Sequence, residues 1–512
     1  MTIQEFIGRI VAEFGFEPTA DQASALRVFA AFLADRRDGC AMVLRGSAGT
    51  GKTSLTGAMM RTMVRLGQHL QLMAPTGRAA KVLSQSSGLP AYTIHRKIYR
   101  EKAYRGLDGL FNLAENRQRN TLFVVDEASM VSRGMGGDLM GASATTFGSG
   151  SLLDDLVQYV YSGAHCRLLL VGDKAQLPPV GEEEAPALSA DMLQGYGLHV
   201  YECDLNEVLR QSRQSGVLYN ATVIRQMVTH DETTQLPRIT FHGFADIVRV
   251  PGDELIEALA TSYSRVGTDD TIVVTRSNKR ATVYNMGIRG TVLDREETLC
   301  RGDMLMVVRN NYYWTERQRE EQMAQAMAQA AQTARQTGQP QAALSTDCRP
   351  TIDFLANGDR AVVQRVRNIR ELYGFRFADV WLSFPDYDDT ELQVVAVLDS
   401  LTTEAPALTR EQHEALFASV MADYADIPTK AERTKALRAD PYFNALQVKF
   451  AYAVTCHKAQ GGQWSHVYVD QGYMTDDMLT PSYIHWLYTA FTRATDKLFL
   501  VNWPKNQCAD EG

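Results

Sequence analysis

Short apolar runs alternate with helical patterns along the first part of the chain. Between two of these runs, residues 52–67 carry apolar side chains at helical spacing and stop at Gly67, a residue suited to the position after a helix end. Apolar strands joined by helices are typical of βαβ units and predict a parallel sheet. The predicted strands are 40–45, 70–75, 121–127 and 166–173.

A second group of apolar runs, at 270–277, 466–470 and 497–503, predicts a second α/β unit. Between them, residues 360–399 are β-rich with polar turns, which favours a small antiparallel module inserted into that unit. Two low-complexity stretches also stand out. Residues 134–151 form a Gly/Ser/Ala loop pattern, and the Ala/Gln-rich 320–343 is compatible with a helix or with disorder.

Composition narrows the class of protein. The 512 residues carry a net charge of −8, which argues against passive coating of nucleic acid but is compatible with a narrow basic channel. No apolar stretch approaches the roughly 20 residues that span a bilayer, and the N-terminus lacks a secretory pattern. Seven scattered cysteines favour neither zinc nor a disulfide framework, so we expect a cytoplasmic location without membrane attachment.

The stretch GSAGTGKT follows a predicted strand and opens a predicted helix, the setting that a nucleotide-binding P-loop requires. Its glycines let backbone N–H groups turn toward phosphates, and the helix N-terminus adds partial positive charge. We expect Lys52 to reach the β- and γ-phosphates of ATP and Thr53 to ligate Mg²⁺. The predicted ATP-binding residues here are Gly46, Ser47, Ala48, Gly49, Thr50, Gly51, Lys52, Thr53 and Ser54.

Polar side chains follow the next predicted strands. Asp126 would hold Mg²⁺ through water, and Glu127 would polarise the attacking water, which favours hydrolysis over transfer to a substrate hydroxyl. Gln176 has an amide that both donates and accepts, which suits the γ-phosphate or that water. The alternatives are a solvated strand end for the carboxylates and a polar loop for the glutamine.

An ordered set of motifs runs over nearly the whole chain. It resembles the RecD-like and Dda-like DNA helicases of superfamily 1B, with insertions at 133–165 and 311–350. The matching stretches are TADQASAL (19–26), GSAGTGKT (46–53), MAPTGRAAKVL (73–83), YTIHRKI (92–98), VVDEASMV (124–131), VGDKAQLPPVG (171–181), LNEVLRQS (205–212), YAVTCHKAQGGQW (452–464) and LYTAFTRAT (487–495).

The resemblance implies an α/β fold with two RecA-like P-loop NTPase domains, a small pin subdomain and an SH3-like β insertion. It further implies an ATP-dependent helicase that moves 5′ to 3′ on single-stranded DNA and unwinds duplex. The implied parts are 1–94 (domain 1A, first part), 95–119 (pin subdomain 1B), 120–215 (domain 1A, second part), 216–310 (domain 2A, first part), 311–444 (linker plus SH3-like domain 2B) and 445–512 (domain 2A, second part).

The resemblance also implies roles at the nucleotide. Gln22 would read adenine, since an amide can pair with its N6 and N7 together. Arg493 would act as an arginine finger from the second domain, with Arg210 acting similarly, because a guanidinium forks toward phosphate oxygens. A surface ion pair is the alternative for either arginine. The expected catalytic residues are Lys52, Glu127, Gln176, Arg210 and Arg493, with Gly461 also at the nucleotide.

For DNA, a strand–helix junction and a basic, aromatic-rich segment are the candidates. Backbone amides at 76–78 suit a phosphate, whereas residues 92–106 offer salt-sensitive affinity and stacking faces. The tip of the pin would be Phe111 or Tyr104. The predicted nucleic-acid residues are Thr76, Gly77, Arg78, His95, Arg96, Phe111, Thr455, His457 and Lys458.

Other functions stay open at this point. A related translocase could act on RNA or displace proteins, and a nucleotide-gated switch would not move along DNA at all. The expected partners are single-stranded and forked DNA, with other replication or repair proteins as candidates. Nothing in the sequence demands more than a monomer.

Overall fold

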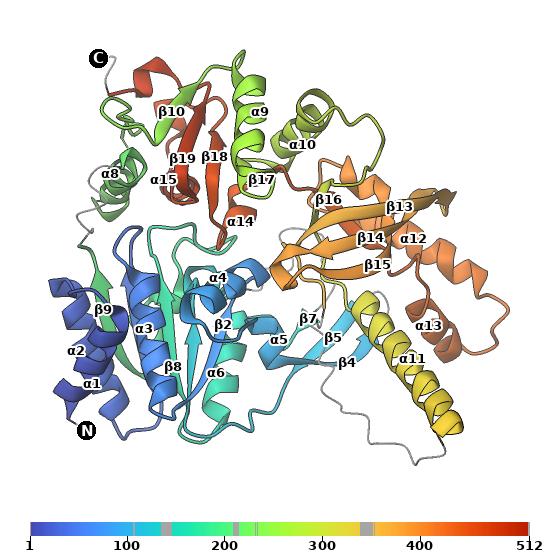
Figure 1. Ribbon diagram of the computed structural model, residues 1–512, viewed down its shortest axis with the longest axis horizontal. Coiled ribbons are helices and arrows are strands. Elements are labelled where there is room, and N and C mark those ends of the chain that lie inside the picture. The colour runs from blue at the N-terminus through green and yellow to red at the C-terminus, as the bar shows by residue number, and fades with distance from the viewer. Residues whose placement is uncertain are drawn as a thin grey trace. The chain divides into compact units, whose positions relative to one another are not determined.

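The computed structural model describes residues 2–105, 108–134, 146–207, 215–230, 232, 234–337, 352 and 354–509. The chain divides into two compact units, residues 1–294 with 452–512 and residues 295–451 (Figure 1). The first unit holds two parallel sheets, and the second holds a closed barrel. The finer domain boundaries set out above stay predictions.

The first sheet has the strand order β3-β2-β6-β8-β1-β9, and every pair is parallel. We call this sheet with its helices the first lobe. Its strands are β1 (Cys40–Gly46), β2 (His69–Ala74), β3 (Ala91–Thr93), β6 (Thr121–Val125), β8 (Arg167–Gly172) and β9 (His199–Leu205). Its helices are α1 (Ile3–Phe14), α2 (Ala20–Ala34), α3 (Lys52–Arg65), α4 (Gly77–Ser87), α5 (Ile94–Ile98), α6 (Leu152–Ser162) and α7 (Ala190–Gln194).

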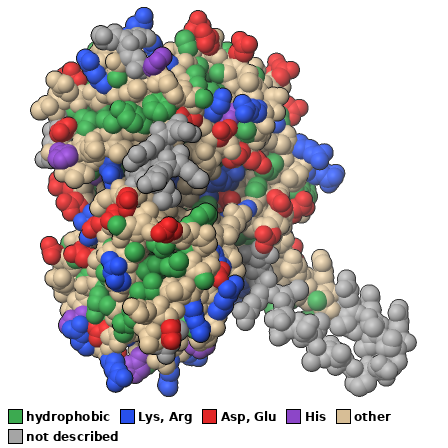
Figure 2. All heavy atoms as spheres, turned by 60° about the vertical axis from the view of Figure 1, so that its left-hand side comes forward, with side chains coloured by type: hydrophobic (Ala, Val, Ile, Leu, Met, Phe, Trp, Pro, Cys, Tyr) green, Lys and Arg blue, Asp and Glu red, His purple; other side chains and the backbone are tan. Residues whose placement is uncertain are grey.

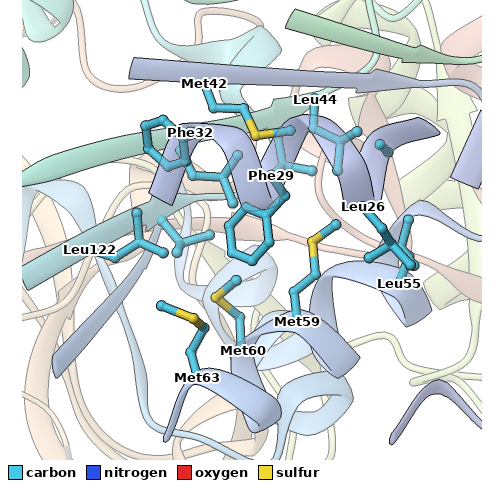
Figure 3. Close-up of a cluster of buried hydrophobic side chains, with 14 of the residues drawn as sticks. Leu26, Phe29, Phe32, Met42, Leu44, Leu55, Met59, Met60, Met63 and Leu122 are labelled. Carbon is cyan, nitrogen blue, oxygen red and sulfur yellow. The ribbon is translucent and has the colours of Figure 1, made fainter. Parts of the chain in front are cut away.

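An apolar core fixes α2 and α3 against this sheet. Figure 3 shows Phe29 of α2 among Met42 of β1 and the α3 methionines Met59 and Met60, all fully buried. Burying such side chains stabilises the fold by roughly 1.5–3 kcal/mol each. The core therefore holds the end of β1 and the start of α3, the two ends of the P-loop, in fixed positions.

A small sheet of β4 (Tyr99–Arg105), β5 (Asp108–Leu113) and β7 (Thr146–Phe147) follows α5 of the first lobe, and its first two strands lie in the segment predicted as the pin.

The second sheet has the order β10-β19-β18-β11-β17, again with parallel pairs. We call it, with its helices, the second lobe. Its strands are β10 (Ile247–Val250), β11 (Thr271–Thr275), β17 (Ala453–Thr455), β18 (Trp464–Asp470) and β19 (Ala494–Val501). Its helices are α8 (Gly216–His230), α9 (Leu255–Val266), α10 (Asn278–Gly287), α14 (Cys456–Ala459) and α15 (Pro481–Phe491).

The second unit is a barrel closed by one parallel pair, β15 with β16, among antiparallel pairs. It confirms the SH3-like insertion, and the two sheets confirm the two RecA-like domains. The strands are β12 (Met304–Val307), β13 (Arg360–Leu372), β14 (Phe375–Phe384), β15 (Thr390–Val397) and β16 (Leu446–Phe450). The helices are α11 (Tyr313–Thr337), α12 (Arg410–Asp423) and α13 (Lys430–Arg438).

Two details differ from what the sequence suggested. The Ala/Gln-rich stretch starts within a helix, α11, which settles the choice between helix and disorder as far as Thr337. The sequence favours core positions over DNA contacts for Phe375, Tyr373 and Trp381; Phe375 is buried, but Tyr373 and Trp381 are partly exposed. The guanidinium groups of Arg365 and Arg367 lie over the Trp381 ring, 5.6 Å and 5.9 Å from its centre.

Candidate nucleotide and nucleic-acid site

The P-loop of the first lobe joins β1 to α3 and has the backbone that a phosphate site needs. Gly49 and Gly51 have positive φ angles of 77° and 74°, a conformation that favours glycine. Gly51 is also the N-cap of α3 and supplies no side-chain cap. The first N–H groups of α3 therefore remain available to an anion, with the helix dipole adding to the attraction.

The side chains of the loop are held ready. The Thr50 hydroxyl donates to the Ser47 carbonyl at 2.8 Å and closes the turn, and Lys52 Nζ donates to the Gly46 carbonyl at 3.1 Å. Thr53 lies in the first turn of α3, partly exposed, and Ser54 is exposed. Lys52 thus spans its own loop, where a phosphate would replace the carbonyl as its partner.

Two buried carboxylates lie within electrostatic reach of Lys52. Burial and the charge of Glu127 raise the pKa of Asp126 to about 6, against the opposing pull of Lys52. Burial likewise raises the pKa of Asp173, which follows β8 and was not singled out from the sequence. A cation placed among these groups would compensate the cost of burying their charge.

Three buried polar atoms at the ends of β6 and β8 have no hydrogen-bond partner within the described structure. They are Glu127 Oε2, Ser129 Oγ and Gln176 Oε1. Glu127 also has a positive φ of 51°, unusual for a residue with a side chain. Unpartnered buried polar atoms are costly, so their concentration beside the P-loop indicates a site made for a polar ligand.

The second lobe reaches the P-loop through α15. The Tyr488 hydroxyl accepts a hydrogen bond from the Ala48 N–H at 3.0 Å and donates to Asp173 Oδ2 at 2.6 Å. One residue later, Thr489 Oγ1 accepts from the Leu177 N–H at 2.7 Å. Tyr488 was not predicted, although it lies in the quoted motif LYTAFTRAT; it and Thr489 tie the two lobes together at the nucleotide end of the first sheet.

Helix α8 supplies a second contact that the sequence did not suggest. Arg225 Nη1 donates to Ser47 Oγ and lies 3.4 Å from Asn206 Oδ1. These residues line a cavity of about 690 Å³ that also borders Gly46 and Asp173. The cavity therefore has walls from both lobes and one end at the P-loop.

Arg493 is buried, with 3% of its surface exposed, and its guanidinium faces its own lobe. It donates to the Thr489 and Gly462 carbonyls, both at 3.0 Å. This placement excludes a surface ion pair, and it links Arg493 directly to the residue that bonds Leu177 of the first lobe. Arg210 lies outside the described residues.

Gln22 is not a surface residue but is 1% exposed at the start of α2. Its Nε2 donates to the Thr50 carbonyl at 2.9 Å, and its Oε1 accepts from the Thr19 N–H at 3.0 Å as part of a capping box. In this structure the amide fastens α2 to the P-loop. Reading adenine, the predicted role, would require Gln22 to exchange these partners.

The predicted DNA residues of the first lobe meet the second lobe at the start of α4. Thr76 caps α4 through a hydrogen bond from the Ala79 N–H, and Gly77 begins the helix. Arg78 donates to the Gln463 carbonyl, and its guanidinium lies 4.5 Å from the centre of the Trp464 ring.

Gly461 belongs to this group rather than to the P-loop residues with which it was predicted. Its φ is +71°, and a Cβ there would lie 2.9 Å from the Cβ of Ala79. Only glycine allows this close approach between the loop after α14 and the N-terminus of α4. Within the described residues, the two lobes therefore meet at the α4 N-terminus as well as at the P-loop and at Leu177.

The other predicted nucleic-acid residues are spread over three segments. His95 and Arg96 lie on α5; burial lowers the pKa of His95 to about 4, so it is neutral near pH 7, and Arg96 lies over the Tyr92 ring at 4.7 Å. The side chains of Phe111 and Tyr104 lie outside the described part. Thr455 is the N-cap of α14, which carries His457 and Lys458.

The described residues contain neither a metal-binding cluster nor a helix suited to crossing a membrane. Over the described ranges, no cluster of three or more His, Cys, Asp or Glu side chains is arranged to hold a metal ion. In the same part of the chain, no helix has both the length and the apolar character for crossing a membrane. Acidic and basic side chains are interspersed on the face that Figure 2 shows.

Two family models match the chain. An AAA domain matches residues 18–244, and a UvrD-like helicase C-terminal domain matches residues 450–501. The first covers the P-loop, Asp126, Glu127 and Arg225, and the second covers Gly461 and Arg493. The first model thus covers the first lobe from α2 onward together with α8 of the second, and the second model covers the last part of the second lobe.

Individual relatives share parts of the chain. The ATP-dependent RecD2 DNA helicase of Deinococcus radiodurans is 37% identical over 140 residues, 27% of this chain and 16% of that protein. The ATP-dependent DNA helicase dda of Enterobacteria phage T4 is 24% identical over 278 residues, 52% of this chain and 56% of that protein. The matches thus span less than two thirds of either relative. The crystal structure of Pif1 helicase from Candida albicans aligns over 96% of both chains with 16% identity and a TM-score of 0.41.

Proposed function

Because the chain belongs to the superfamily 1B helicases, as its motifs predicted, we propose that it is an ATP-dependent DNA helicase. We infer that it moves 5′ to 3′ on single-stranded DNA and separates duplex ahead of it. The observation that carries this proposal is that the second lobe contacts the P-loop of the first, through Tyr488 at Ala48 and through Arg225 at Ser47. A nucleotide bound there would contact both lobes at once.

The first lobe provides the hydrolytic groups. Lys52 turns from the Gly46 carbonyl to the phosphates, and Glu127 orients and polarises the attacking water with its unpartnered carboxylate oxygen. Gln176 presents its free amide oxygen to the same water. Thr53 and Asp126 would hold Mg²⁺, which neutralises phosphate charge when bound. The burial of Asp126 and its raised pKa fit a group that is completed by a cation.

The second lobe couples hydrolysis to movement. The hydrogen bonds of Thr489 and Gln460 to the backbone of Leu177 connect α15 and the end of α14 to the loop that carries Gln176. A change at Gln176 on loss of the γ-phosphate can therefore alter the contact between the lobes. Arg493, held by the Thr489 carbonyl, would follow that change. This is a two-state switch biased by differential affinity for nucleotide.

DNA would bind where the N-terminus of α4 meets the second lobe. The N-terminus of α4 offers backbone amides, and Arg78 offers a guanidinium stacked on Trp464. Gly461 brings the second lobe within contact of this helix end. A DNA strand that contacts both lobes would be bound with different affinity in the open and closed states. Alternation between these states would then move the protein along the strand.

The proposal is tested by ATP hydrolysis with and without single-stranded DNA. We expect stimulation by DNA and its loss in Lys52→Ala, together with loss of unwinding, while Lys81→Ala, a change of the same type on α4, retains activity. Undiminished unwinding by Lys52→Ala without hydrolysis would refute the proposal. Stimulation by RNA but not DNA would instead favour an RNA translocase, and hydrolysis indifferent to both would favour a nucleotide switch.

A further inference from the structure

Arg225 lies on the second lobe but contacts the nucleotide loop of the first. It occupies the third turn of α8 (Gly216–His230), a helix that packs on α15 and β19, as Figure 1 shows for α8 and α15. Its Nη1 donates to the Ser47 hydroxyl, at the second position of the P-loop. An arginine of the second lobe is thus presented to the phosphate loop of the first lobe, independently of Arg493.

The partners of Arg225 are neutral. Within the described residues it has the Ser47 hydroxyl and, at 3.4 Å, the Asn206 amide oxygen as acceptors, and no carboxylate lies within ion-pair distance. The carboxylates that line the same cavity are engaged elsewhere or face solvent: Asp204 pairs with Arg45, and Asp173 accepts from Tyr488. A half-buried guanidinium without a counter-ion favours an anion.

The position of Arg225 relates it to the terminal phosphate. Its charge acts on the Tyr488 hydroxyl, which in turn bonds Asp173. The charges of Lys52 and Glu127 act on Asp173 as well. Arg225 therefore belongs to the same electrostatic cluster as the groups assigned to the γ-phosphate and the attacking water.

We propose that Arg225 binds the terminal phosphate of a nucleoside triphosphate, as a second contact from the second lobe beside Arg493. The inference rests on the proposed function, because it assumes that the P-loop holds a nucleotide. Arg225 exchanges the neutral Ser47 hydroxyl for a charged phosphate oxygen, and such charge-assisted hydrogen bonds are the stronger kind. ADP offers no such oxygen, so Arg225 distinguishes triphosphate from diphosphate.

The test is equilibrium binding of two fluorescent nucleotides, the N-methylanthraniloyl derivatives of ADP and of β,γ-imido-ATP, to the full chain with Mg²⁺. Arg225→Met should weaken binding of the imido-ATP derivative on the order of 10- to 100-fold and change the affinity for ADP by less than about threefold. Arg225→Lys, which keeps the charge but loses the fork, should fall between. Arg265→Met, which removes an exposed arginine from α9, is the matched control and should bind both as the wild type does.

Retained ADP binding by Arg225→Met shows that the variant has folded. The inference is overturned if Arg225→Met binds the imido-ATP derivative as tightly as the wild type, or if it loses both nucleotides equally, since a tether between lobes would do the latter. The assay uses neither DNA nor turnover. Failure of the wild type to bind either nucleotide would overturn the proposed function with it, whereas wild-type binding that Arg225→Met leaves unchanged overturns this inference alone.

Discussion

Removal of one hydroxyl group tests whether the lobes are joined at the P-loop. Tyr488→Phe keeps the ring of α15, which is 1% exposed, and deletes only the oxygen that bridges Ala48 and Asp173. The substitution introduces no extra volume, so packing within the second lobe should be preserved. The change therefore acts on the contact between the lobes and on the environment of one buried carboxylate.

The expected cost follows from the two lost hydrogen bonds. The bond to Asp173, at 2.6 Å, involves a charged acceptor and contributes about 1.5–3 kcal/mol. Ala48 is partly exposed, so we expect its N–H to turn to water in the variant and the loss of this hydrogen bond to add little. Burial raises the pKa of Asp173 and the tyrosine hydroxyl opposes that rise, so removing the hydroxyl makes the charged carboxylate costlier, and the loss of stability should be larger at alkaline than at acidic pH.

Hydrogen exchange of the nucleotide-free protein is the appropriate measurement. In the wild type, the Ala48 amide should be protected, and Tyr488→Phe should lose that protection and unfold at a lower temperature. Bound phosphate would compete with the hydroxyl for this amide, so the variant should bind nucleotide more tightly than the wild type, not more weakly.

Tyr483→Phe supplies the matched control on the same helix. Its hydroxyl donates to Gln471 within the second lobe and is also buried. This variant should lose stability to a similar degree but leave the P-loop amides and nucleotide affinity unchanged. If Tyr488→Phe has wild-type stability and wild-type exchange at Ala48, the contact between the lobes described here is wrong.

Three further predictions concern the carboxylates and the DNA side. Burial and the charge of Glu127 raise the pKa of Asp126 from 3.8 to about 6. The charged carboxylate therefore lowers the stability of the fold above that pH, and this cost disappears as the pH falls. Asp126→Asn should raise the melting temperature in metal-free buffer near about pH 8 but not near about pH 4, and it should abolish ATP hydrolysis. Gly461→Ala places a Cβ 2.9 Å from the Cβ of Ala79 at a positive φ, so fluorescence anisotropy should report weaker binding of labelled oligo-dT, by about 5- to 150-fold for a cost of roughly 1–3 kcal/mol. Arg78→Ala should lower the same affinity and reduce its salt dependence by about one ion; a salt slope equal to the wild type would exclude a phosphate contact.

Local sequence patterns were sufficient to predict the parts of the fold that depend on interactions between residues near each other in the sequence. Apolar runs gave the central strands β1, β6 and β8, and the P-loop motif gave the start of α3. Strand β9 was missed because its residues before Leu205 are exposed or partly buried and include charged side chains, without the continuous apolar run of a central strand. The edge strand β10 was missed because it has four residues, one of them arginine.

Only the part of the candidate site that the P-loop motif and the neighbouring strand ends encode could be predicted from the sequence. Tyr488 lies 440 residues from Ala48, and Arg225 lies 178 residues from Ser47, so no spacing pattern relates either pair. The position of Asp173 after an apolar strand was a usable signal, the same one that identified Asp126. By contrast, the contact of Gly461 with Ala79 depends on how two loops approach, which only coordinates reveal.

The central claim is that one nucleotide, held by both lobes, drives movement along DNA. It is tested most directly by unwinding of forked DNA with either a 5′ or a 3′ tail, with ATP consumption followed in parallel, for the wild type and Arg493→Ala. We predict that the wild type unwinds the 5′-tailed fork while consuming ATP, and that Arg493→Ala loses both activities by a factor on the order of 10³. Wild-type rates in Arg493→Ala, or unwinding that requires a 3′ tail, would contradict the account.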